Sequence, residues 1–122
     1  MVRVSGEPLR NEPVTGAFVP EKASRELRVG HFLRIGSYLD NAILSMWAGR
    51  RPQVMMGMAE ASVRGYGPGG ADGTDEEILV RLRELIREAR EYYAAGDFPA
   101  AMARMRVAED LVALYTIRIS GE

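Results

Sequence analysis

The chain has 122 residues, a formal net charge of −1 and a charged fraction of 27%. This length suits one domain with a single hydrophobic core. The absence of cysteine excludes disulfides, thiolate zinc sites and thiol chemistry. The near-zero net charge gives no electrostatic reason to expect nucleic-acid binding.

Residues 1–20 carry three prolines, at positions 8, 13 and 20. A helix cannot run through prolines at that spacing, because each removes an amide donor and clashes with the preceding turn. We therefore expect an extended N-terminal arm over residues 1–20, in which the apolar Phe18 contacts the bundle or a neighbouring subunit. The arm has no apolar signal core, and no stretch approaches the roughly 20 apolar residues of a membrane span. The sequence thus predicts a cytoplasmic protein with no membrane association.

The longest predicted helix covers residues 21–48. Its apolar residues recur at steps of three and four, which is the spacing of one helical face. The residues of this face are Leu27, His31 or Phe32, Ile35, Leu39, Ala42 or Ile43, and Met46. Gly30 and Gly36 lie inside the helix at a cost of about 1 kcal/mol each relative to alanine, so they indicate a kink or a close helix crossing. Gly49 is expected to cap the C-terminus of this helix.

A second, shorter helix is predicted over residues 52–65. Pro52 favours a first helical position, where its missing amide would be unpaired in any case. The residues of its predicted buried face are Val54, Met55, Met58, Ala61 and Ser62. The stretch 65–73 is rich in glycine, has no lysine for a phosphate-binding loop and follows a helix rather than a strand. We interpret it as a flexible linker.

The last third of the chain predicts a helical hairpin, with helices over residues 75–95 and 98–118. Thr74 and Glu77 have the spacing of a capping box at the start of the first helix. The dipeptide Gly96-Asp97 supplies a C-cap for the first helix and an N-cap for the second. Because apolar residues recur at helical spacing on both segments, we expect the two helices to pack against each other.

These elements together predict an all-α fold. We expect a four-helix antiparallel bundle made of two helical hairpins, with residues 21–122 forming a single domain behind the arm. The residues expected to fill its core are Leu39, Ile43, Leu82, Leu85, Ile86, Ala89, Met105, Ala108 and Val112.

The segment EYYAAGDFPAA, residues 91–101, forms the corner of the predicted hairpin. It resembles the Tyr-x3-Gly-Asp-Phe/Tyr-x2-Ala turn of tetratricopeptide-type helical hairpins, which HEPN-like and small archaeal helical-bundle proteins of unknown function share. The resemblance implies a tightly packed pair of helices and little about activity. A tetratricopeptide array needs about three copies for a continuous core, and only one copy is visible in this sequence.

Arg25 and His31, separated by five residues, resemble the Arg-x4–6-His element of HEPN ribonucleases. The resemblance implies that Arg25 supports a scissile phosphate and that His31 acts as acid and base, a role that suits a side chain titrating near neutral pH. This chain departs from the family pattern in two ways. Glu26 follows the arginine, and the pair lies in the first helix rather than in the later ones.

Other catalytic or metal chemistry has little support. His31 is the only histidine, so a metal site with two or more histidines is impossible, while carboxylate-only sites remain open. Glu84, Glu88 and Glu91 interleave with arginines on one helix, which is typical of a solvated face with weak surface ion pairs. No nucleophile elbow surrounds any serine. We therefore predict no catalytic residues, no cofactor and no metal.

The leading functional prediction is a non-catalytic helical interaction module, either homo-oligomeric or a small subunit of a larger assembly. Methionine adapts to varied partner surfaces, and four of the seven methionines lie between residues 46 and 58. The predicted interaction surface consists of Phe18, Trp47, Met55, Met56 and Met58. The alternative is an RNA-binding or HEPN-like ribonuclease-type protein that uses Arg25 and His31. In that case nucleic acid would contact Arg50, Arg51 and Arg64, because arginine with nearby aromatic residues can stack on single-stranded bases.

Overall fold

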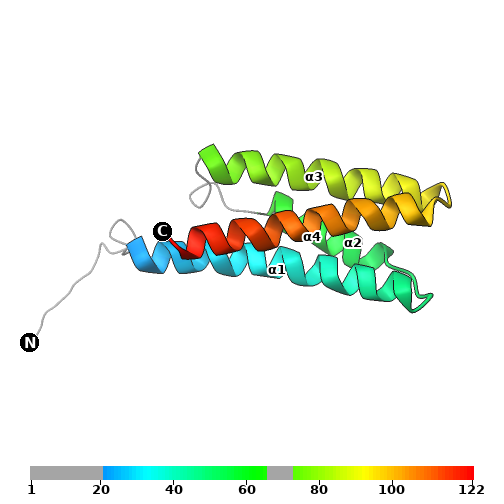
Figure 1. Ribbon diagram of the computed structural model, residues 1–122, viewed down its shortest axis with the longest axis horizontal. Helices are drawn as coiled ribbons and strands as arrows, with labels where there is room; N and C mark the ends of the chain where they lie inside the picture. Colours follow the sequence, from blue (N-terminus) through cyan, green and yellow to red (C-terminus); the bar gives the residue numbers. More distant parts are fainter. Residues whose placement is uncertain (1–20, 66–72) are drawn as a thin grey trace, which may run out of the picture.

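The computed structural model describes residues 21–65 and 73–122, and within these ranges every regular element is an α-helix. The helices are α1 (Glu21–Trp47), α2 (Gln53–Arg64), α3 (Gly73–Ala94) and α4 (Phe98–Ser120). Each packs against two neighbours, in the cyclic order α1, α2, α3, α4, and successive helices run in opposite directions (Figure 1). The predicted four-helix antiparallel bundle is confirmed. The predicted arm over residues 1–20 and residues 66–72 of the predicted linker lie outside the described residues.

Two chain reversals form one end of the bundle, on the right in Figure 1. Gly49 and Gly96 both have positive φ, of 72° and 82°, a conformation that glycine adopts without steric cost. At the first reversal the Arg50 amide bonds to the Ser45 carbonyl at 2.7 Å and the Gly49 amide bonds to the Met46 carbonyl at 3.1 Å. This is the Schellman pattern, which satisfies the free carbonyls at a helix C-terminus.

The second reversal repeats this pattern between α3 and α4. The amides of Asp97 and Gly96 bond to the carbonyls of Tyr92 and Tyr93 at 2.9 and 3.0 Å. The Asp97 side chain then accepts a hydrogen bond from the Ala100 amide at 3.2 Å. The cap residues predicted at Gly49, Gly96 and Asp97 are therefore confirmed, and they place both reversals at the same end.

The core divides into two clusters along the bundle axis. The larger one includes Phe32, Ile35, Leu39, Leu82, Leu85, Ile86, Val112 and Ile119. The smaller one consists of Ala42, Ile43, Met56, Ala89 and Met105, with Met46, Met55, Tyr93 and Met102 partly buried against it. All nine residues predicted to fill the core are buried.

The predicted buried face of α2 is wrong. Met56, Ala59 and Val63 are buried, whereas Val54 and Met58 are exposed. This 12-residue helix carries apolar residues on both sides, so periodicity alone cannot decide which side faces the core. As a consequence Met56, predicted to belong to an interaction surface, lies in the core instead.

Leu27 is also misplaced by the sequence pattern, since it is 71% exposed. At 1.5 Å per residue, α2 spans about 18 Å and α1 about 40 Å, so α2 covers only part of α1. His31 bonds to Ser62, near the end of α2, and Leu27 lies one turn further on. Because α2 ends two residues after Ser62, it leaves Leu27 exposed. Within the described residues, none of the four helices is both long and apolar enough to cross a membrane.

Candidate functional site

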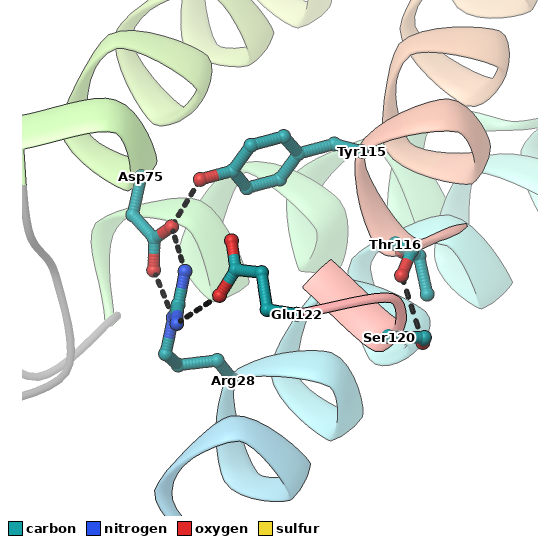
Figure 2. Close-up of polar contacts among 6 residues, drawn as sticks. All are labelled: Arg28, Asp75, Tyr115, Thr116, Ser120 and Glu122. Carbon is teal, nitrogen blue, oxygen red and sulfur yellow. Dashed lines mark hydrogen bonds and ion pairs between the residues drawn. The ribbon is translucent and has the colours of Figure 1, made fainter. Parts of the chain in front are cut away.

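A buried carboxylate joins three helices at the end of the bundle where α1 begins (Figure 2). Asp75, in the first turn of α3, is fully buried. Arg28 of α1 donates from Nε to Oδ2 and from Nη2 to Oδ1, both at 2.9 Å. The hydroxyl of Tyr115, on α4, donates to the same Oδ1. A further contact of 3.3 Å runs from Arg28 Nη1 to the carboxylate of Glu122.

The surroundings keep the Arg28 guanidinium in its charged form. The hydrogen bonds and charge of Asp75 raise the pKa of Arg28 above its already high ordinary value, against the opposing effect of burial. The Tyr115 ring meets Phe32 edge-on, with centroids 5.1 Å apart, which directs its hydroxyl to Asp75. An acidic side chain at a helix N-terminus is also favoured by the helix dipole. Both Asp75 oxygens accept hydrogen bonds and neither reaches the surface, so the cluster acts as a structural connection.

Sequence reasoning missed this cluster, because it interpreted the start of α3 only through Thr74 and Glu77. The available signal was weak. Asp75 lies four residues before the buried Leu79, so one helical turn places it on the core-facing side. Phe32 was assigned to an apolar face, and nothing in the sequence links it or Tyr115 to Asp75.

The structure places Arg25 and His31 on different sides of α1. The imidazole Nε2 of His31 lies 2.9 Å from the Ser62 carbonyl oxygen on α2, and since a carbonyl only accepts, His31 donates. Arg25 lines a hollow on another side of the helix, together with Val29, Leu33 and Ser120 of α4. Six helical positions correspond to 600°, so these two side chains point about 120° apart.

The three arginines considered for nucleic-acid contact are also divided. Arg50 and Arg51 lie at the start of α2, and Arg64 lies at its last residue. The 13 positions from Arg51 to Arg64 span roughly 20 Å along the helix axis. Arg64 pairs with Glu60 at 3.5 Å. Arg50 and Arg51 are exposed and form no ion pair with any residue that the structure describes.

Carboxylates do not assemble into a metal site in the described part of the chain. No group of three or more histidine, aspartate or glutamate residues in residues 21–65 and 73–122 is placed to hold an ion. One acidic pair does form between α1 and α4. Partial burial and the neighbouring Asp40 raise the pKa of Glu109 above its ordinary value, with a smaller effect of Asp110 and an opposing effect of Arg106. Two carboxyl groups in contact favour a shared proton.

Methionine side chains cluster at the end of the bundle that carries the two chain reversals. Five side chains from three helices meet in and around the smaller core cluster, and we call this region the methionine-rich end. Its methionines are Met46, Met55, Met56, Met102 and Met105. The sequence pointed to the first three through their proximity along the chain. Met102 and Met105 reach the same region only because α4 begins beside the end of α1.

Of the hollows at the methionine-rich end, Arg50 lines two. The first hollow has a volume of about 230 Å³ and is lined by Met46, Gly49, Arg50, Tyr93 and Phe98. The second hollow has a volume of about 540 Å³ and is lined by Asn41, Leu44, Ser45, Ala48, Arg50 and Met55. Tyr93 and Phe98 are in contact, with ring centroids 5.2 Å apart. The hollows therefore combine an apolar floor with one cation between them.

Large apolar side chains remain exposed around these hollows. Trp47 is 69% exposed and Phe98 is 51% exposed. Trp47 follows Gly36 by three helical turns, so both lie on one side of α1, and Gly36 faces Val112 of α4. Trp47 thus points towards the side where α4 begins at Phe98. Leu44 and Val54 are exposed near the second hollow. A rim of exposed apolar side chains is typical of an interaction site.

Of the residues predicted to form an interaction surface, Trp47 and Met55 lie at this end, and Met58 is exposed one turn along α2. Phe18 lies outside the described residues. Phe98 and Tyr93 were missed, because they were interpreted only as parts of the hairpin turn. No protein-family model matches the chain, and no curated protein or solved structure matches it either.

Proposed function

We propose that this chain is a non-catalytic helical interaction module that binds another protein chain through its methionine-rich end. The observation that carries the proposal is the combination of two open hollows, a floor of methionine, and exposed Trp47 and Phe98 at the rim. Flexible, polarisable methionine adapts to the shape of a partner. Tryptophan, tyrosine and arginine are the residue types that contribute most to binding energy at interfaces.

The amount of apolar surface supports the proposal. A fully covered aromatic side chain buries about 150–250 Å². Covering the exposed parts of Trp47 and Phe98 would therefore remove on the order of 250 Å² from water, which is worth roughly 6 kcal/mol before the costs of association are subtracted. This is the type of central anchor around which a standard interface of about 800 Å² per partner is built.

A ribonuclease-type function has less support. It would require Arg25 and His31 to act on one phosphate, but they lie on different sides of α1, and the imidazole of His31 is engaged with the Ser62 carbonyl. One observation favours RNA binding without cleavage, because Trp47 is close in the sequence to Arg50 and Arg51, which are exposed and pair with no carboxylate among the residues that the structure describes. The aliphatic Leu44 and Val54 at the same rim fit a protein partner better than stacked bases.

Affinity co-purification from the cells that make this chain tests the proposal. Trp47→Asp and Phe98→Asp place a charge at the rim and should remove a bound partner chain. Leu114→Asp is the matched control, since Leu114 is 67% exposed and lies about 24 Å from Phe98 along α4. All three sites are exposed, so the fold should persist, and circular dichroism checks this.

The expected result is a partner chain, identified by mass spectrometry, that is retained by wild type and Leu114→Asp and lost from both rim variants. The proposal fails if the partner is retained by the two rim variants, or if no chain associates with wild type.

A further inference from the structure

We infer that the partner segment bound at the methionine-rich end is an acidic amphipathic helix, whose apolar side chains enter the two hollows while its carboxylates pair with Arg50 and Arg51. This inference rests on the proposed function and adds the chemistry of the ligand. It depends on the position of the two arginines, on the lining of the hollows and on the charges elsewhere at this end.

The two arginines are available to a partner. Every ion pair formed by the other arginines near this end is made within the bundle. Arg90 pairs with Glu60 of α2, Arg104 with Glu88 at 2.8 Å, and Arg87 with Glu91 at 3.8 Å. Arg50 and Arg51 are exposed and pair with no described carboxylate. Guanidinium groups bind carboxylates through paired hydrogen bonds.

Arg50 lies where a ligand with both apolar and acidic side chains would need a cation. It lines both hollows, so a carboxylate bound to it would lie between two apolar side chains that fill them. A helix presents apolar residues at steps of three and four with charged residues between them. Helix-in-groove recognition uses this spacing of anchors. An acidic amphipathic helix therefore matches the apolar–cationic–apolar order of the surface.

A second copy of this chain fits less well. Association of two copies about a twofold axis at this end would bring Arg50 and Arg51 of both copies close together, and like charges at an interface are unfavourable. Asp97, an exposed carboxylate in the second chain reversal at this end, already accepts the Ala100 amide at the start of α4. The rim charges therefore favour a different chain as the partner.

Trp47 reports directly on this surface, because it is the only tryptophan in the sequence. Its emission should move to shorter wavelength when a partner covers it and removes water. The probes are two synthetic helical peptides with the same leucine and phenylalanine anchors, one with glutamate and one with lysine at the polar positions. A single-stranded oligouridine is the third probe, since it tests stacking of bases on the same aromatic side chains.

The acidic peptide should shift Trp47 emission and bind about tenfold or more tightly than the lysine peptide. The double variant Arg50→Glu/Arg51→Glu should reverse this order of affinities. The control Arg34→Glu/Arg83→Glu changes two exposed arginines away from this end and should leave the preference intact. Equal binding of the two peptides, or a preference that survives in the Arg50→Glu/Arg51→Glu variant, would overturn the inference.

One outcome overturns this inference alone, and another overturns the proposed function as well. If Trp47 emission shifts only with rising protein concentration, together with a doubled mass by light scattering, the interface is real and its partner is a second copy. If the oligouridine alone changes Trp47 emission, with a dependence on salt, the surface binds nucleic acid and both proposals fail.

Discussion

Asp75 connects α1, α3 and α4 through a single carboxylate, and this makes it the most sensitive polar position in the described chain. Removing one partner of a buried ion pair leaves the other charge uncompensated, at a cost of about 3–5 kcal/mol. We expect Asp75→Ala to lower the free energy of unfolding by this amount in urea denaturation. The neighbouring Glu76 is exposed, so Glu76→Ala should cost much less. A loss below about 1 kcal/mol for Asp75→Ala would show that the cluster contributes little.

A substitution at Tyr115 separates the contribution of the hydroxyl to stability from that of the aromatic ring. Tyr115→Phe keeps the edge-on contact with Phe32 and removes only the donor to Asp75. Hydrogen bonds to charged groups contribute about 1.5–3 kcal/mol, so we expect a loss in that range, smaller than for Asp75→Ala. Thermal unfolding followed by circular dichroism would rank the two variants, and the reverse order would contradict this account of the cluster.

The raised pKa of Glu109 predicts a specific dependence of the chain's stability on pH. Because its pKa is raised in the folded chain, the native state holds this proton more tightly than the unfolded state does. The stabilisation is complete below the ordinary pKa of glutamate and is lost as pH rises through the raised value. At neutral pH the charges of Asp40 and Glu109 repel each other.

Glu109→Gln removes that repulsion and keeps a hydrogen-bond donor for Asp40. We expect it to raise the melting temperature at pH 7, with a gain that disappears by about pH 4, where wild-type glutamate is largely protonated. Glu26→Gln, a change at an exposed glutamate of α1, serves as the control and should show no such pH-dependent gain. A gain that is constant across this pH range would exclude the carboxyl pair as its cause.

At the scale of single helices, the two glycines inside α1 have different roles. A Cβ added at Gly30 would meet nothing within 4 Å, whereas one added at Gly36 would lie 3.2 Å from a methyl carbon of Val112 on α4. Gly36 therefore permits the close crossing of α1 and α4, one of the two alternatives that the sequence left open. Nothing in the described structure explains why Gly30 is a glycine.

This difference gives a paired prediction for α1. Gly30→Ala should stabilise the chain by about 0.5–1 kcal/mol, through the better helix propensity of alanine and the reduced freedom of the unfolded chain. Gly36→Ala brings the same gain in helix propensity but crowds Val112. It should therefore stabilise the chain less than Gly30→Ala does, or destabilise it. Chemical denaturation of both variants measures the difference. Equal stabilisation by the two substitutions would mean that α1 and α4 do not pack closely at Gly36.

The helices differ in how far their sequences determined their placement. The α3–α4 hairpin was predictable, because the Gly96 and Asp97 caps and a consistent stripe of apolar residues indicate the same turn and the same buried face. Its N-terminal boundary was wrong, since α3 begins at Gly73 and Thr74 therefore lies inside the helix rather than at its N-cap. For α2, Val54 and Met58 on one side compete with Met56, Ala59 and Val63 on the other. Only the positions of α1 and α3 settle which side is buried. Leu27 was misjudged for a related reason, since the length of α2 decides whether it is covered.

At the scale of the whole molecule, the candidate site was predictable in part. Trp47, Met55 and Arg50 are near one another in the sequence, so their shared surface could be anticipated. Phe98 and Met102 join them because both reversals lie at one end of an antiparallel bundle, which is a property of the tertiary arrangement. The Arg28–Asp75–Tyr115 cluster likewise depends on the meeting of three helices, and no local sequence pattern predicts it.

The central claim is that another protein chain covers the methionine-rich end, and site-specific photo-crosslinking in living cells tests it most directly. A benzophenone side chain would replace Trp47, Phe98 or, as the control of similar exposure, Leu114. We predict a covalent adduct with another chain from positions 47 and 98 and none from position 114. Adducts from position 114 alone, or no adduct from any of the three positions, would contradict the claim.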